Sequence, residues 1–215
     1  MELKRVVVTG MGALTPLGNT VDEYWNSLIN GVSGADMITL FDASKFRTKF
    51  ACEVKGFDAT QYLDRKEARK IDRFTQFALV VSDQAMADAG LTKDNINPDR
   101  IGVVFASGIG GLITFQHEVT DFARGDGTPR FNPFFIPKMI LDIAAGQISM
   151  RHNLRGPNFA VVSACASSTN AIMDAFNLIR LGKADILVTG GSEAVISEAG
   201  VGGFNAMKAM SERNH

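Results

Sequence analysis

The 215-residue sequence predicts an α/β fold in which a mixed, mostly parallel sheet is covered by helices. Short apolar runs of strand length alternate with longer segments whose apolar residues recur every three or four positions. The apolar runs end in glycine-rich turns or, in one case, in a turn that carries a cysteine. Because this alternation favours parallel strands, these turns should meet at one edge of the sheet, where α/β proteins bind their ligands.

Composition limits the class of protein. With 46% hydrophobic and 21% charged residues, the chain can bury a substantial core as one large domain or two small ones. Its 22 lysines and arginines against 23 acidic residues produce no overall field that favours nucleic acid or a membrane. Two distant cysteines form no disulfide framework, no Cys/His cluster has metal-ligand spacing, and neither a signal peptide nor a membrane-length apolar segment is evident. We therefore expect a soluble cytoplasmic protein without a metal site.

The first strand is predicted over residues 5–9, and Gly10-Met-Gly12 follows it. A Gly-x-Gly turn after a strand suggests a dinucleotide site, but Thr15 stands where the third glycine belongs, and the next helix begins too late. The acidic residue expected at the end of a second strand is also lacking. We therefore reject a nucleotide-binding function.

The next segments are predicted to be a capped helix, a loop and a long basic helix. Thr20 should cap a helix over 21–30, and 41–57 should form a loop with short strands in which Cys52 is structural. An apolar stripe predicts one helix over 65–89, whose first turns carry five basic residues. Such a run is more typical of a solvated helix face, although it could also dock an acidic partner.

The middle of the chain contains a second buried strand and an unusual aromatic segment. The strand, over 101–106, leads into Ser107-Gly-Ile-Gly-Gly111, where the backbone must bend sharply. Helices are expected over 112–122 and 138–150. Between them, the three phenylalanines and two prolines of 131–137 exclude a regular helix or central strand. They could line an apolar pocket, form an interface or fill an edge of the core.

Two more buried strands are predicted, over 159–162 and 184–189. Between them, a helix should start near Ser167 and end at Gly182, with a buried face formed by Ile172, Ala175, Phe176 and Ile179. Four turns should then converge at the sheet edge, namely those at Gly10–Gly12, Gly108–Gly110, Cys165 and Gly190–Gly191.

Cys165 is placed just before the start of a helix. The unpaired amides and the dipole of a helix N-terminus stabilise a thiolate, which favours a nucleophile at this position. A small apolar thiol packed into the turn fits the position equally well. A nucleophilic cysteine normally needs a base or a cationic neighbour, and the sequence places none of His117, His152 and His215 as its partner.

Six segments resemble the condensing enzymes, specifically the β-ketoacyl-[acyl-carrier-protein] synthase II branch of fatty-acid synthesis. The resemblance extends in order from residue 3 to about residue 213 and rests on VVVTGMGALTPLG at 6–18, SGIGG at 107–111, NPFF at 132–135, GPN at 156–158, SACASS at 163–168 and GG at 190–191. It implies a thiolase-like fold, in which a duplicated α/β unit forms a subunit about twice as long as this chain, normally in a homodimer.

By this resemblance, Cys165 accepts an acyl chain from the phosphopantetheine thioester of acyl carrier protein, and its own N–H is one oxyanion donor. Decarboxylation of malonyl-carrier then gives a carbanion that attacks the acyl-enzyme in a Claisen condensation. No cofactor is implied beyond the phosphopantetheine that arrives on the carrier. The matching acyl-pocket positions are Ile109, Phe135 and Phe204, and the matching carrier-binding positions are Lys66, Arg69, Lys70, Arg130 and Lys208. The resemblance therefore favours the docking interpretation of the basic run.

The sequence departs from the family in one large respect. Two histidines and a lysine of the family, together with a phenylalanine-containing gate, lie in a C-terminal half that has no counterpart here, and His215 does not replace them. We therefore expect residues 1–215 to be an N-terminal synthase domain, engineered or naturally shortened, that does not complete the reaction alone and self-associates. The alternative is a non-catalytic module that docks acyl carrier protein or dimerises. Cys165 favours the enzyme, because the related chain-length-factor subunits lack this cysteine.

Overall fold

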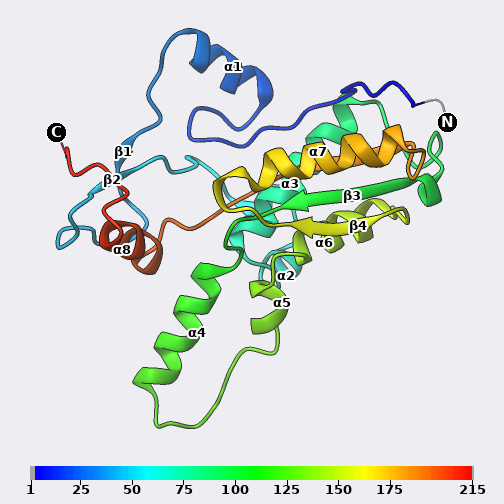
Figure 1. Ribbon diagram of the computed structural model, residues 1–215. Helices are drawn as coiled ribbons and strands as arrows, with labels where there is room; N and C mark the ends of the chain where they lie inside the picture. The colour runs from blue at the N-terminus through cyan, green and yellow to red at the C-terminus, as the bar shows by residue number, and fades with distance from the viewer. Residues whose placement is uncertain (1–2, 215) are drawn as a thin grey trace.

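The computed structural model describes residues 3–214, and at its centre lies a parallel sheet of three strands (Figure 1). The strand order is β4 (Asn158–Val161), β3 (Ile101–Ala106) and β5 (Ile186–Gly191). Val103 of β3 lies opposite Asn158 of β4 and Val188 of β5. The predicted α/β class and the parallel pairing are confirmed.

The central strand β3 is buried along its whole length because helices cover both faces of the sheet. These helices are α3 (Arg73–Asp88), α6 (Ile143–His152) and α7 (Ser167–Arg180). Val103 and Phe105 belong to the core that β3 forms with α3 and α6. Val104 and Ala106 belong to a second core, which they form with α7. The alternation of side chains along a strand thus divides the core into two layers.

The remaining elements surround this three-layer centre. They are α1 (Val21–Ile29), β1 (Asp36–Met37), β2 (Phe50–Ala51), η1 (Ala59–Gln61), α2 (Arg65–Ala68), η2 (Pro98–Arg100), α4 (Leu112–Arg124), α5 (Phe135–Met139), η3 (Ala164–Ala166) and α8 (Glu198–Ala206). The short strands β1 and β2 pair antiparallel. Figure 1 shows α4 and the loop to α5 projecting away from the sheet. No helix among residues 3–214 combines the length and apolarity that a membrane crossing requires.

The predicted strand over 5–9 is wrong. The segment is irregular, and Val7 and Val8 are 59% and 80% exposed. Strand propensity alone does not form a strand, because the backbone also needs a neighbouring strand to pair with. None of the described strands pairs with this segment.

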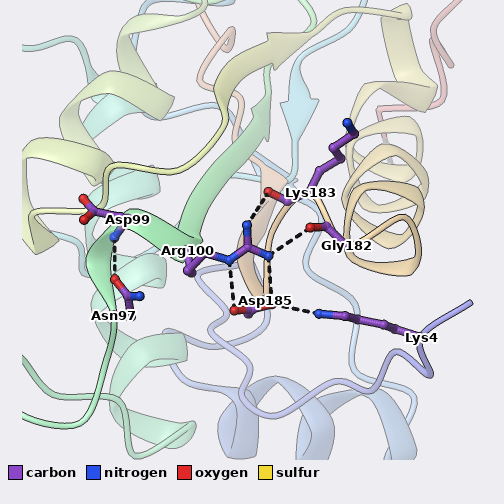
Figure 2. A network of polar contacts seen from close by, with 7 residues as sticks. All are labelled: Lys4, Asn97, Asp99, Arg100, Gly182, Lys183 and Asp185. Atoms are coloured by element: carbon purple, nitrogen blue, oxygen red, sulfur yellow. Dashed lines mark hydrogen bonds and ion pairs between the residues drawn. The ribbon is translucent and has the colours of Figure 1, made fainter.

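A polar network instead anchors the start of the chain (Figure 2). Lys4 Nζ lies 3.0 Å from Asp185 Oδ1, and the Arg100 guanidinium donates to both Asp185 oxygens at 3.0 and 3.1 Å. Arg100 also donates to the Gly182 carbonyl at 2.9 Å. The hydrogen bonds from Arg100, followed by that from Lys4, hold the pKa of Asp185 well below its ordinary value. The network joins the N-terminal segment to the turn before β5.

The predicted long helix over 65–89 is divided into α2 and α3. Asp72 causes the break, because its carboxylate accepts from the Phe74 N–H at 3.2 Å and so caps α3. The same carboxylate accepts from the Thr114 N–H at 3.1 Å and is 4% exposed. Asp72 therefore also ties the start of α3 to α4. The predicted helices over 21–30, 112–122 and from Ser167 are confirmed within a few residues.

Two further predictions need correction. The helix expected over 138–150 is two helices, and α5 begins at Phe135, inside the segment that was expected to be irregular. Pro137 is tolerated there because the first turn of a helix needs no backbone donors. The prediction of which α7 residues are buried is also wrong in part. Ala171 and Ala175 are buried against β3, whereas Ile172 and Phe176 are 52% and 41% exposed.

Candidate active site

Cys165 lies in a tight turn that follows β4 and precedes α7. The Ser163 N–H donates to Ser167 Oγ at 2.8 Å, and the Ser167 hydroxyl donates to the Ala164 carbonyl at 2.7 Å. Asn170 Nδ2 donates to Ser163 Oγ at 2.7 Å. These bonds hold Ala164 at a φ of 52°, a left-handed conformation that side chains disfavour. The residue before the cysteine is therefore strained, as is frequent at functional sites.

The thiol of this turn is accessible. Cys165 is free and exposed, which argues against the interpretation of a small apolar thiol packed into the turn. It precedes the first residue of α7 by two positions, at the end where backbone N–H groups lack helical partners. Among the described residues, no acceptor is bonded to the Cys165 N–H, whereas the Ala166 N–H bonds to the Ser163 carbonyl at 3.2 Å. Cys52 is also free and exposed.

Three of the four predicted turns converge at this edge of the sheet. Gly108 follows β3, and a Cβ on it would lie 3.4 Å from the Ala164 carbonyl oxygen. Gly191 ends β5, and a Cβ on it would overlap the Ser168 hydroxyl. The turn at Gly10–Gly12 does not join them, because Gly10 lies against Ala85 in the C-terminal half of α3, and α3 runs antiparallel to the sheet. That part of the prediction is wrong.

Glu193, which the sequence did not single out, lies at the same edge. Its Oε2 accepts from the Gly108 and Ile109 N–H groups at 2.8 and 3.0 Å. Its Oε1 accepts from the Ser107 hydroxyl at 3.1 Å and from the Gly110 N–H at 3.3 Å. In the sequence, Glu193 is marked only by its position two residues after the Gly190–Gly191 turn. Its hydrogen bond with Gly108 cannot be read from the sequence, because the two residues are 85 positions apart.

Comparison with known proteins identifies the family. A model described as "Beta-ketoacyl synthase, N-terminal domain" matches residues 3–215. The chain belongs to the β-ketoacyl synthase family.

Relatives and solved structures agree with this assignment. The 3-oxoacyl-[acyl-carrier-protein] synthase 2 of Synechocystis sp. is 47% identical over 214 residues, which is 100% of this chain and 51% of that protein. A β-ketoacyl synthase from Burkholderia phymatum matches 100% of this chain and 52% of its own, with a TM-score of 0.85 and 31% identity. A type II PKS acyl-carrier protein in complex with its ketosynthase gives a TM-score of 0.85 at 28% identity, covering 100% of this chain and 51% of that chain. The thiolase-like fold is confirmed, and the chain spans about half the length of these proteins.

The three predicted acyl-pocket positions differ in how close they lie to the cysteine turn. Ile109 is 40% exposed, in the loop that borders the cysteine turn. Phe135 starts α5 and stacks on Phe131 with ring centroids 5.5 Å apart. Gly111, beyond Ile109, lies against the Lys138 carbonyl of α5, so the two elements adjoin. Phe204 is 36% exposed on α8, a helix that contacts α4.

The predicted carrier-binding positions of the synthase domain form one group and one outlier. Lys66, Arg69 and Lys70 are exposed, and the described residues supply no ion-pair partner for them. Lys70 Nζ lies 5.7 Å from the centroid of Phe134, which brings the basic run beside the segment that contains Arg130. Arg130 pairs with Asp126 at 3.4 Å. Lys208 lies elsewhere, at a cavity of about 390 Å³ lined also by Lys45 and Arg47.

The histidines of the described residues do not complete a catalytic pair with Cys165. His152 Nε2 lies 3.1 Å from Asp83 Oδ1, between α6 and α3. Burial opposes the charge on Asp83, but the hydrogen bonds of its carboxylate with His152 and Arg151 outweigh burial and lower its pKa. His117 is exposed on α4, and His215 lies outside the described residues. Within residues 3–214, no group of three or more His, Cys, Asp or Glu side chains could hold a metal ion.

Proposed function

We propose that this chain is the acyl-accepting domain of a 3-oxoacyl-[acyl-carrier-protein] synthase, with Cys165 as its nucleophile. The single observation that carries the proposal is the exposed Cys165 in a strained turn at the start of α7. The relative from Synechocystis, named 3-oxoacyl-[acyl-carrier-protein] synthase 2, supports the same assignment.

The acyl transfer follows from this geometry. The Cys165 thiolate attacks the carbonyl carbon of an acyl thioester on the carrier, and negative charge develops on the carbonyl oxygen. The Cys165 N–H is available to stabilise that oxygen, whereas the amides of Gly108, Ile109 and Gly110 already bond to Glu193. The intermediate collapses by breaking the carrier's carbon–sulfur bond. The acyl group remains on Cys165, and the carrier leaves as its phosphopantetheine thiolate, which then takes a proton from water.

The second half-reaction requires groups that the described residues do not place at Cys165. In the proposed synthase, malonyl-carrier loses CO₂, and the resulting carbanion attacks the acyl-Cys165 carbonyl. The new carbon–carbon bond forms as the Cys165 carbon–sulfur bond breaks, which releases the Cys165 thiolate. His152 faces Asp83, and so it does not serve as the base or the charge-stabilising group. The curated relative is about twice as long, and we propose that residues 1–215 correspond to the N-terminal half of such a synthase. This half alone carries out at most the acyl transfer.

We also propose how the substrates are held. Ile109, Phe135 and Phe204 line the acyl pocket, with Phe135 reaching toward a partner subunit's pocket. The acidic carrier protein binds the basic group of Lys66, Arg69, Lys70 and Arg130, and Lys208 provides a separate contact. The carrier brings the phosphopantetheine as part of the substrate, so that no separate cofactor is needed. The unpaired cations of the basic run support this assignment, because free charges at a surface steer an oppositely charged partner.

We infer a cytoplasmic homodimer that pairs through β4. This strand is one edge of the sheet, and none of the other strands within residues 3–214 pairs with its outer side. Phe159 and Val162 on and beside it are 38% and 56% exposed, and α7 above it exposes Ile172 and Phe176. An open edge strand with apolar neighbours favours pairing with a second copy.

The proposed function is tested with an acyl-loaded carrier protein and mass spectrometry of the intact chain. An added acyl mass on the wild type, which is absent from Cys165→Ser and retained in Cys52→Ser, supports acyl transfer. Carrier binding without an adduct would overturn the proposed chemistry and favour the alternative of a non-catalytic docking module. Analytical ultracentrifugation of wild type and Phe159→Lys tests the dimer, which should dissociate in the variant.

A further inference from the structure

The loop after β3 depends on one side chain for its conformation. Ser107, Gly108, Ile109 and Gly110 turn away from the strand, and Gly110 adopts a φ of 77°. Three consecutive N–H groups of this loop point to the same carboxylate, that of Glu193. Such a concave run of backbone donors is an anion site, and here the protein fills it with its own acid. Hydrogen bonds to a charged acceptor are stronger than neutral ones.

The remaining interactions at the tip of the loop are few. The Gly110 N–H also bonds to Ser107 Oγ at 3.1 Å, but this contact lies within the loop. Gly111 is the first residue that bonds to another element, through the Met139 carbonyl of α5 at 3.1 Å. Among residues 3–214, Glu193 is the only acceptor bonded to the Gly108 and Ile109 N–H groups. Their position is therefore set chiefly by the carboxylate.

The loop and the cysteine turn are in contact, so the position of one affects the other. A Cβ on Gly108 would lie 2.9 Å from Glu193 Oε2 and 3.4 Å from the Ala164 carbonyl oxygen. Glu193 thus stands at the contact between the loop and the residue before Cys165. Ile109, whose side chain is 40% exposed, extends from the same loop.

We propose that Glu193 is a positioning residue that fixes Ile109 relative to Cys165 and so sets which chain lengths reach the thiol. The role of Ile109 as a pocket wall rests on the proposed function. The position of the loop relative to the cysteine does not. Because Glu193 occupies the Gly108, Ile109 and Gly110 amides, it also prevents the loop from competing with the Cys165 N–H for an oxyanion.

The proposal is tested with Glu193→Gln, which keeps the size of the side chain but replaces one accepting oxygen by a donor. Glu23→Gln is the matched control, because Glu23 accepts from a backbone N–H at Asn19, near α1 and outside the sheet. Hydrogen exchange of the Gly108, Ile109 and Gly110 amides should accelerate about ten- to hundred-fold in Glu193→Gln and not in the control. Exchange in β3 and α7 should stay as in the wild type, which verifies that the variant is folded.

The second measurement uses alkylation of Cys165 by iodoacetamides that carry N-alkyl chains of increasing length, so it needs no carrier protein. In the wild type, the fixed loop should favour some lengths over others. In Glu193→Gln, the ratio of long-chain to short-chain alkylation rates should differ from that of the wild type by about threefold or more. In Glu193→Asp, which keeps the carboxylate, the ratio should lie between those of Glu193→Gln and the wild type. Unchanged exchange at Gly108–Gly110, or an unchanged ratio despite faster exchange, would overturn the proposal. Failure of acyl transfer from the carrier would overturn the proposed function and leave both of these measurements intact.

Discussion

Gly191, at the end of β5, lies directly against Ser168 in the first turn of α7. A Cβ at Gly191 would overlap the Ser168 hydroxyl and would lie 2.8 Å from the Ala106 carbonyl oxygen of β3. The ends of β3 and β5 therefore meet the first turn of α7 with no room for a side chain at residue 191. This close approach holds the cysteine turn against the sheet.

Gly191→Ala should therefore destabilise the domain. Because the Ala106 carbonyl oxygen is a backbone atom, the backbone must shift, and we expect a loss of about 1–3 kcal/mol in the free energy of unfolding. Urea denaturation measures the change. Gly203→Ala in α8 is the control, since open space surrounds that position, and it should be neutral or gain up to about 1 kcal/mol. Equal stability of Gly191→Ala and the wild type would contradict the close approach.

The strain at Ala164 gives a second prediction. A left-handed conformation costs a residue with a Cβ about 1–2 kcal/mol, and glycine relieves this cost while adding about 0.5–1 kcal/mol of unfolded-chain entropy. Ala164→Gly should therefore match or slightly exceed the wild type in stability. Ala166→Gly has only the entropic cost, because Ala166 has a φ of −93°. If Ala164→Gly proves less stable than Ala166→Gly in urea, the strain is absent.

Cys165 should react with iodoacetamide faster than Cys52 near neutral pH. Both thiols are exposed, so that access alone does not separate them. The amides at the start of α7 favour a negative sulfur at Cys165, whereas Cys52 follows a two-residue strand. Mass spectrometry of the Cys52→Ser and Cys165→Ser variants gives the two rates separately. Equal and slow labelling would argue against an activated thiol.

Asp185 should make the stability of the domain sensitive to acid. Its folded pKa is lowered from the ordinary value of 3.8 by the hydrogen bond from Arg100 and then by that from Lys4. A group with a lowered folded pKa stabilises the fold above its unfolded pKa, and this stabilisation disappears as the pH falls. Between pH 5 and pH 2, the urea midpoint of the wild type should therefore fall more steeply than that of Asp185→Asn. The exposed Asp94→Asn should follow the wild type.

The basic run gives a prediction about the carrier. Lys70→Glu reverses a charge within the proposed docking surface and should weaken binding of acyl carrier protein about tenfold at low salt, with a smaller difference at high salt. Lys93→Glu reverses the charge of another exposed lysine, outside that surface. Titration calorimetry with both variants separates a local effect from a change in net charge. Equal weakening by the two would rule out docking at the basic run.

The central strand and its turn could be predicted from the sequence because their signals are local. Residues 101–106 form a continuous apolar run, and the run of glycines that follows leaves the chain no regular continuation. The helix after Cys165 was predicted for the same reason. Its buried face was predicted less well. The small side chains of Ala171 and Ala175 allow α7 to pack closely on β3, and such a fit depends on both elements and not on the sequence of the helix alone.

The parts that were missed depend on partners distant in the sequence. Residues 5–9 have strand propensity, but a strand also requires a neighbour, and here the segment is held by Lys4 and Asp185. The apolar stripe over 65–89 predicts one continuous helix. Asp72 divides it into α2 and α3, because its carboxylate caps α3 and also bonds to Thr114. Glu193 acts on a loop 85 residues earlier in the chain. Cys165 could be singled out as a candidate from the sequence because the helix that begins beside it follows it directly in the chain.

The order of the strands has a consequence for synthesis on the ribosome. Both neighbours of β3 come later in the chain, and β5 begins about 80 residues after β3 ends. At roughly 5–20 residues per second, the most buried strand of the protein waits on the order of ten seconds for its second partner. During that interval, Val103, Val104 and Phe105 are available to other nascent chains. Newly made protein should therefore depend on chaperones more than its folded stability would suggest, and most strongly for chains that have not yet reached Ile186.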